Sequence, residues 1–110
     1  MSFPVSQVDP ADLLRWLKQN EWRRVTGDST VQIGPCFLFH VAIDSDGNGD
    51  GDATLYDNPG GANGRSFKIY TVDESSHEKN FNPPLYFAQG LYVDVGTNCE
   101  AVTVHYRPVK

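Results

Sequence analysis

Cysteine is scarce in this chain: Cys36 and Cys99 are the only two in 110 residues. Small disulfide-stapled domains need several bridges, so two cysteines exclude a disulfide scaffold. The two thiols could lie side by side on paired strands. We instead expect two separate, buried or half-buried thiols, as in proteins of a reducing compartment.

Long apolar runs and an excess of basic residues are also missing. No apolar run approaches the roughly 18–20 residues that span a bilayer, and residues 1–4 lack the basic start and apolar stretch of a secretion signal. Nine Lys and Arg stand against fourteen Asp and Glu, a formal net charge of −5. Because binding to phosphates requires a basic surface, we expect neither nucleic acid nor a membrane as partner.

The sequence also lacks the common motifs of catalytic sites. The sequence has no nucleophile elbow, no phosphate-binding glycine loop and no cysteine pair at metal-ligand spacing. His40 and His105 fall on predicted strands and could meet each other or the two cysteines in a zinc or redox site, although a histidine at the edge of a core is the commoner arrangement. Since no acid–base or nucleophilic constellation is visible, we expect a protein without enzymatic activity.

Turn-forming residues, in contrast, are abundant, with ten Gly and seven Pro. They divide the chain into short segments in which apolar and polar residues alternate, which is typical of strands. The predicted strands are residues 22–26, 30–33, 37–43, 53–57, 66–72, 85–88, 91–95 and 102–107. The polar residues 73–84 predict a long loop. This spacing favours an all-β protein: an antiparallel β-sandwich, jelly-roll or immunoglobulin-like, with seven or eight short strands.

The segment 37–43 is apolar on both of its faces. Alternation puts Phe37, Phe39, Val41 and Ile43 on one face and Leu38, His40 and Ala42 on the other. A strand that is apolar on both sides is typical of the middle of a sheet. We therefore expect this strand to have a neighbour on each edge.

The N-terminal segment carries the signals of a short helix over residues 9–20. Asp9 can cap the free N–H groups and Pro10 suits the first helical position. An apolar stripe at helical spacing follows, consisting of Leu13, Leu14, Trp16 and Leu17. Because a short helix needs a partner surface to persist, we interpret residues 1–21 as a docking arm and residues 22–110 as the β-sandwich domain. The four apolar side chains are the candidate partner-docking residues.

An acidic, glycine-rich stretch over residues 44–57 is the main candidate metal site. A twelve-residue frame that starts at Asp46 resembles the calcium loop of EF-hands and dockerins. Its candidate ligands are Asp46, Asn48, Asp50, Asp52 and Asp57. The flanking segments are strand-like, however, and an extended course over residues 54–56 would carry Asp57 too far to close the cage. A solvated turn that needs no metal is therefore the main interpretation, and calcium the alternative; no other cofactor is expected.

The segments from Trp22 to Tyr106 also resemble a known group of proteins in their order and patterns. The segments concerned are residues 25–26, 30–35, 53–58, 66–69, 90–96 and 101–107. They resemble small β-sandwich virion proteins encoded in the structural gene clusters of tailed phages. The arm lies outside this resemblance, and the acidic loop is longer than the usual short turn.

The resemblance implies a capsid decoration or cement protein that binds the major capsid protein and stabilises the head. It implies a virion location after synthesis in the host cytoplasm, and a homo-oligomer, with a trimer favoured. On this interpretation the arm packs on a neighbouring subunit or on the capsid protein.

Two other functions stay open. The first is a head-fibre, neck or tail accessory module that binds carbohydrate or a host surface, for which exposed aromatic residues such as Tyr86, Tyr92 and Tyr106 could form a platform. Cross-strand packing is the commoner role of such tyrosines. The second is an adhesion module stabilised by calcium.

Overall fold

A computed structural model describes residues 21–109. This part of the chain consists of eight strands joined by turns, and it contains no helix that could cross a membrane. The strands are β1 (Glu21–Val25), β2 (Ser29–Ile33), β3 (Cys36–Ser45), β4 (Gly51–Tyr56), β5 (Ser66–Thr71), β6 (Ser76–Phe87), β7 (Gly90–Val95) and β8 (Cys99–Pro108). The arm predicted over residues 1–21 lies outside the described residues except for its last residue, Glu21, which begins β1.

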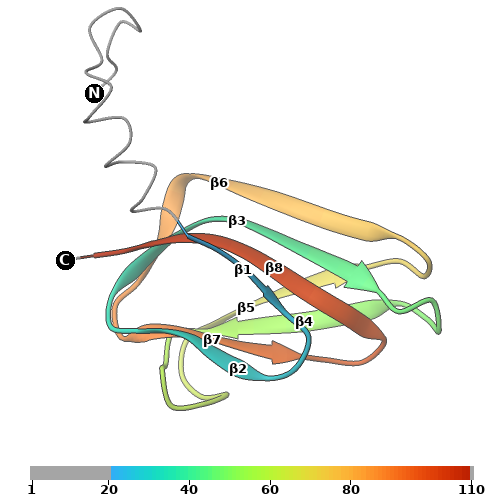
Figure 1. Ribbon diagram of the computed structural model, residues 1–110, viewed down its shortest axis with the longest axis horizontal. Helices are drawn as coiled ribbons and strands as arrows, with labels where there is room; N and C mark the ends of the chain where they lie inside the picture. Colours follow the sequence, from blue (N-terminus) through green and yellow to red (C-terminus); the bar gives the residue numbers. More distant parts are fainter. Residues whose placement is uncertain (1–20, 110) are drawn as a thin grey trace, which may run out of the picture.

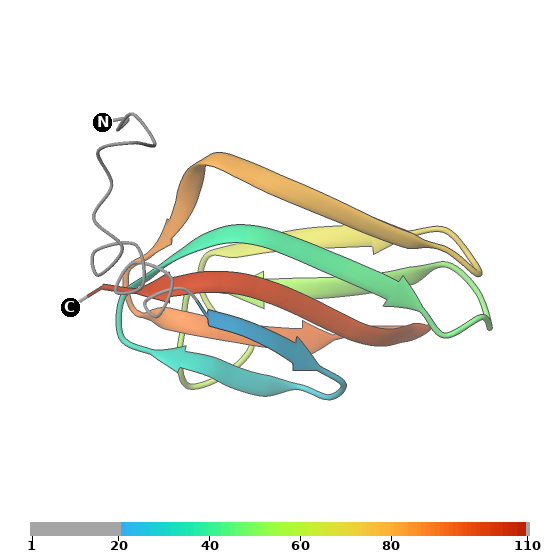
Figure 2. The same ribbon diagram turned by 45° about the horizontal axis from the view of Figure 1, so that its top comes forward.

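The strands form two four-stranded antiparallel sheets that face each other (Figures 1 and 2). Sheet A has the order β1-β8-β3-β6, and sheet B has the order β2-β7-β4-β5. Four of the strand pairs are nested in the sequence: β1 pairs with β8, β2 with β7, β3 with β6 and β4 with β5. The prediction of an all-β antiparallel sandwich is therefore confirmed.

The core lies between the sheets and follows from the alternation of side chains. In β4, for example, every second residue is buried, ending with Ala53 and Leu55. In β8, Val102, Val104 and Tyr106 face inward, so the expectation that Tyr106 is exposed is wrong. Burying a Val, Leu or Ile side chain contributes about 1.5–3 kcal/mol. The core cluster consists of Val25, Val31, Cys36, Leu38, Val41, Ile43, Ala53, Leu55, Ile69, Phe87, Leu91, Val93, Val102, Val104 and Tyr106.

The loop predicted over residues 73–84 is wrong from Ser76 onward, because β6 begins there. The first five residues of β6 are all exposed, so this half of the strand shows no apolar alternation. β6 is an edge strand of sheet A and has one neighbour, β3. A polar surface on an edge strand opposes pairing with other chains. Pro83 and Pro84 lie where the pairing with β3 is interrupted, the position in which a sheet tolerates proline.

β3 lies between β8 and β6, which confirms its predicted central position. The predicted division of its faces is wrong, because a β-bulge shifts the register with β8 between Leu38 and His40. The extra residue in a bulge moves the following side chains to the opposite face. Leu38 before the bulge and Val41 after it are therefore both fully buried. Phe37 and Phe39, predicted to share a face with Val41, lie on the outer side instead.

Candidate functional site

The acidic loop between β3 and β4 uses its carboxylates to hold its own backbone. Asp46 Oδ1 accepts a hydrogen bond of 2.8 Å from the N–H of Asn48. Asp50 Oδ1 accepts one of 2.9 Å from the N–H of Asp73, whose carboxylate in turn accepts one from the N–H of Gly49. These contacts tie the β3–β4 loop to the β5–β6 loop at the same end of the sandwich.

Asp52 ties β4 to the turn after β7 in the same manner. Its Oδ1 accepts a hydrogen bond of 2.8 Å from the N–H of Thr97, and its Oδ2 lies 3.6 Å from Lys68 Nζ. A Cβ atom at Gly96 would overlap the Asp52 carboxylate. The close approach of this carboxylate to the turn therefore requires glycine at that position.

Asp57 follows the last residue of β4, Tyr56, and so lies at the opposite end of this strand from the acidic loop. Residues 54–56 are extended, so the structure does not bring Asp57 together with Asp46, Asp50 and Asp52. Its buried carboxylate accepts hydrogen bonds from three consecutive backbone N–H groups that join β6 to β7: those of Ala88, Gln89 and Gly90, at 3.1, 2.8 and 3.4 Å.

The charge state of Asp57 follows from these contacts. Burial by itself would raise the pKa of Asp57, but the three backbone hydrogen bonds and the charge of Arg65 lower the pKa below its usual value. Asp57 is thus an ionised clamp on the β6–β7 turn. Within residues 21–109, no group of three or more His, Cys, Asp or Glu is arranged to hold a metal ion.

The two cysteines lie at opposite ends of β3. Cys36 begins that strand, whereas Cys99 pairs with its last residue, Ser45. Nine residue steps separate these ends, about 30 Å at roughly 3.3 Å per residue, so a disulfide is excluded by distance. Both cysteines are free thiols, and Cys36 faces the core while His40 faces outward. The hypothesis of a joint histidine–thiol site is therefore wrong.

His40 and His105 do meet, as the sequence allowed, and they belong to a row that crosses sheet A. Trp22 in β1 pairs with His105 in β8, His105 pairs with His40 in β3, and His40 pairs with Asn80 in β6. The indole of Trp22 stacks on the imidazole of His105, with ring centroids 4.3 Å apart and an interplanar angle of 8°. His40 Nδ1 forms a hydrogen bond of 2.7 Å with Asn80 Oδ1, and His40 Nε2 lies 3.7 Å from a carboxylate oxygen of Glu78.

The next row of sheet A continues the same aromatic surface. Phe37 in β3 lies between Arg107 of β8 and Tyr86 of β6, and its ring centroid is 5.3 Å from that of Tyr86. Phe39, at the bulge, is 5.5 Å from His105, and the guanidinium of Arg107 lies 5.6 Å above the Phe39 ring. We call this outer surface of sheet A the aromatic face and define it as Trp22, Phe37, Phe39, His40, Tyr86 and His105.

Exposure and charge distinguish the aromatic face from the core. Trp22 is 62% exposed and Tyr86 is 47% exposed, while the rings between them are half-buried. Burial, with a smaller contribution from His40, lowers the pKa of His105 below its usual value. The imidazole under Trp22 is therefore mainly neutral at neutral pH.

The outer surface of sheet B has a different composition. Aspartate, threonine, lysine and serine alternate there with Tyr56, Tyr70 and Tyr92, and Lys68 lies over the exposed ring of Tyr70. The outward side of an antiparallel sheet is usually polar, and sheet B follows this rule in part, since Ile33 of β2 is 78% exposed. Sheet A departs further from the rule, because six aromatic rings gather on its outer side, and an apolar surface patch is a common mark of an interaction surface.

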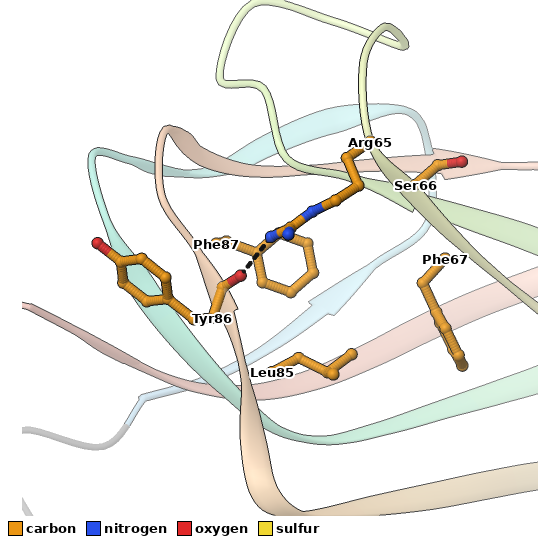
Figure 3. A pocket seen from close by; sticks show the side chains of 6 residues that line it. All are labelled: Arg65, Ser66, Phe67, Leu85, Tyr86 and Phe87. Atoms are coloured by element: carbon orange, nitrogen blue, oxygen red, sulfur yellow. Dashed lines mark hydrogen bonds between the residues drawn. The ribbon is translucent and has the colours of Figure 1, made fainter.

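A hollow of about 270 Å³ opens on the side of the sandwich between β5 and β6 (Figure 3). Its apolar lining consists of Phe67, Leu85 and Phe87. At its rim, Arg65 Nη2 donates a hydrogen bond of 2.8 Å to the carbonyl oxygen of Tyr86, as the dashed line in Figure 3 shows, and lies 3.3 Å from Asp57. The Arg65 side chain therefore links the segment before β5 to the end of β6.

A second hollow carries residue types that could suggest a catalytic triad. It is lined in part by Asp50, Ser75, Ser76 and His77. The Asp50 carboxylate accepts a backbone N–H, and the Ser75 hydroxyl donates to the carbonyl oxygen of Ser76 at 3.4 Å. These two side chains thus contact the backbone and not the imidazole, so the nucleophile–base contact that a triad requires is not formed.

The three tyrosines proposed as a sugar platform do not share a surface. Tyr106 is buried and donates a hydrogen bond of 2.7 Å to Glu21 Oε2. Tyr92 packs against Tyr56 on sheet B, with centroids 6.5 Å apart, whereas Tyr86 belongs to the aromatic face.

The partner-docking residues predicted in the arm, Leu13, Leu14, Trp16 and Leu17, lie outside the described residues. The aromatic face itself was missed by sequence reasoning. Its only visible signal was the segment 37–43, apolar on both sides, which was interpreted as a buried strand.

Comparison with known proteins gives no match: no family model, no curated protein and no solved structure matches this chain.

Proposed function

We propose that this chain is a non-enzymatic structural protein of a tailed-phage virion, a capsid decoration or cement protein that binds the major capsid protein and stabilises the head. The observation that carries the proposal is the aromatic face on the outer side of sheet A. Exposed rings that include Trp22 and Tyr86 are stabilised when another protein covers them, because aromatic side chains contribute most of the energy of many interfaces.

The strand order is compatible with a capsid role. Nested pairing of β1 with β8, β2 with β7, β3 with β6 and β4 with β5 is the winding of an eight-stranded jelly roll and differs from the seven- or nine-stranded immunoglobulin arrangement. Jelly rolls are common among viral capsid and lectin domains. This architecture is compatible with the proposed function and with its first alternative, so the choice rests on surface chemistry.

The ends of the sandwich favour a rigid assembly part over a catalyst. Asp50, Asp52 and Asp57 each direct a carboxylate at backbone N–H groups of a neighbouring loop, so these groups maintain the shape of the loops. A protein repeated on a capsid lattice can bind through many weak contacts at once. The proposal includes a closed homo-oligomer, with a trimer favoured, in the virion.

The proposal is tested by adding purified protein to capsids that lack it and measuring the bound fraction by co-sedimentation. We expect the unmodified chain to sediment with the particles and to raise their melting temperature. Trp22→Ser should bind at least about tenfold more weakly, the effect of removing one interface hot spot. Tyr70→Ser is the matched control, since Tyr70 is 61% exposed but lies on sheet B. Equal binding of both variants would refute a role of the aromatic face.

A carbohydrate- or host-surface-binding module is the alternative that a specific observation favours. Trp22 is a flat ring, 62% exposed and stacked on His105, with polar Asn80 and Glu78 in the same region of sheet A. Such a ring can stack on a sugar. A glycan array with the unmodified chain tests this alternative: specific signals that disappear in Trp22→Ser would support it, and uniform background would reject it.

The calcium-stabilised adhesion module is a third possibility and has less support. The Asp46, Asp50 and Asp52 carboxylates each accept a backbone hydrogen bond at Oδ1, and within the described residues they do not converge with other acidic groups on a metal position. We expect the melting temperature to be the same with millimolar calcium and with chelator; a large rise with calcium would favour this module.

A further inference from the structure

We infer that the aromatic face of one copy of this chain seats residues 9–20 of a second copy, so that exchanged arms join the copies of the oligomer. The inference rests on the assembly role in the proposed function and gives the aromatic face one partner, the arm of the next copy, in place of the capsid protein. The weaker capsid binding expected for Trp22→Ser then follows from the loss of the oligomer and of its avidity. It follows from the dimensions of the face, the chemistry of the segment and the way in which β1 begins.

The dimensions of the two partners agree. The row from Trp22 through His105 and His40 to Asn80 crosses all four strands of sheet A. Three inter-strand spacings of about 4.8 Å make this row about 14 Å wide. A helix over the twelve residues 9–20 would be about 18 Å long at 1.5 Å per residue. One such helix, lying across the strands, would cover the row completely.

The chemistry of the two partners is complementary. The segment contributes an apolar stripe of three leucines and one tryptophan at helical spacing, Leu13, Leu14, Trp16 and Leu17. A helix this short is marginal in water unless its apolar stripe is buried. The aromatic face offers half-buried rings with one prominent ring, Trp22, at its margin. The apolar stripe of the arm needs a surface that buries it, and the partly exposed rings of the aromatic face need a cover.

The start of β1 favours exchange between copies over folding back within one copy. Glu21 is fixed in the first position of the strand by its pairing with Tyr106, and its carboxylate accepts a hydrogen bond from the Tyr106 hydroxyl. The sequence has neither Gly nor Pro over residues 11–20, so the predicted helix adjoins β1 without turn residues. Connections between a helix and an adjacent strand usually need about 2–6 residues. Because the predicted helix ends next to Glu21, few residues are left for a reversal onto the same copy, which favours the aromatic face of a second copy.

An arm that binds the next copy makes a head-to-tail contact, and such contacts close into a ring when the rotation permits. In a closed ring of three copies, every arm would be bound and every aromatic face would be covered. It would also give the proposed decoration protein several capsid contacts in one particle, and so the benefit of avidity.

The first experiment measures the mass of the full-length chain in solution by analytical ultracentrifugation. We expect a closed oligomer for the unmodified chain and for the control Tyr70→Ser. We expect monomers for a face variant, Trp22→Ser with Tyr86→Ser, and for an arm variant in which Leu13, Leu14, Trp16 and Leu17 are replaced by Ser. Circular dichroism establishes that each variant keeps its strands. A monomeric unmodified chain, or a folded arm variant that stays oligomeric, would overturn the inference.

The second experiment mixes the two monomeric variants. The face variant keeps an intact arm, and the arm variant keeps an intact face, so one productive contact remains between them. We expect a 1:1 complex in the mixture and none in either variant alone. If the mixture stays monomeric, the arm does not bind the face of another copy and the inference fails.

The outcomes separate this inference from the proposed function. Particle binding by an unmodified chain that is monomeric in solution would overturn the arm exchange and leave the capsid role standing. An oligomer that passes the mixing test but does not bind capsids would overturn the capsid role and support the arm exchange.

Discussion

The clamp formed by Asp57 allows a sharp prediction about stability. Its buried carboxylate is the acceptor for the three backbone N–H groups of Ala88, Gln89 and Gly90. Asp57→Ala would remove all three acceptor contacts together. Gly90 is buried, so its N–H would have no acceptor, whereas Ala88 and Gln89 are exposed and water can replace the carboxylate there.

The magnitude follows from these contacts. A hydrogen bond to a charged group contributes about 1.5–3 kcal/mol, and an unsatisfied buried donor costs about 1–3 kcal/mol. Because water compensates at two of the three positions, we expect Asp57→Ala to lower the free energy of unfolding by about 3 kcal/mol. For a domain of this size each kcal/mol shifts the melting temperature by about 4–8 °C, so the expected fall is about 12–24 °C.

Two further variants separate the hydrogen bonds from the ion pair. Arg65 also contacts Asp57, but the Arg65 side chain is 72% exposed, so Arg65→Met should cost less than about 1 kcal/mol. Asp57→Asn keeps one acceptor oxygen and should fall between the other two variants. Thermal unfolding monitored by circular dichroism measures all three. A melting temperature of Asp57→Ala equal to that of Arg65→Met would refute the reasoning.

The pH dependence of the Asp57 clamp has a definite sign. The pKa of Asp57 is lower in the folded protein than its ordinary value of 3.8. Its contribution is therefore complete above the unfolded pKa and is lost as the pH falls through the folded pKa. The stability difference between the unmodified chain and Asp57→Asn should shrink below about pH 4. A difference that stays constant in denaturant titrations down to about pH 3 would contradict this assignment.

Three other predictions concern the thiols, an imidazole and a glycine. Burial raises the pKa of Cys36 to about 12 and that of Cys99 to about 11, so both should react with a thiol reagent far more slowly in the folded than in the unfolded chain, and non-reducing gels should show no intrachain disulfide. Because burial and a neighbouring imidazole lower the pKa of His105, the unfolded chain binds that proton first, and stability should fall as the pH decreases through about 6.5; His105→Gln should flatten this part of the melting profile, and an unchanged profile would contradict it. Gly96→Ala would place a methyl group on the Asp52 carboxylate and should lower stability by about 1–3 kcal/mol, measured by thermal unfolding; an unchanged melting temperature would show that the turn can relax.

The features that followed from the sequence are those with a regular period. Alternation in the last predicted strand placed Val102 and Val104 on one face, and this face is the buried one, because a half-buried strand repeats every two residues. The exposed half of β6 has no such period, since an edge strand with a polar surface looks like a loop in the sequence. Asp57 was a candidate calcium ligand only in the alternative interpretation, and the extended course over residues 54–56 that argued against it is present. Its actual partners are N–H groups more than thirty residues away, which the sequence pattern did not indicate.

The aromatic face depends on one irregularity that no period reveals. Without the bulge, strict alternation after Leu38 would put His40 in the core and Val41 outside. The bulge places both Phe39 and His40 outside and returns Val41 to the core. The strand thus supplies aromatic side chains to the surface while losing none of the aliphatic residues that its core requires. Functional sites are among the places where such local rules are broken. An irregularity alone does not distinguish the two sheets, because the register of β2 in sheet B also shifts, between Thr30 and Gln32. What distinguishes sheet A is that its bulge adds Phe39 and His40 to a continuous row of rings, and for this reason we propose sheet A as the interaction surface.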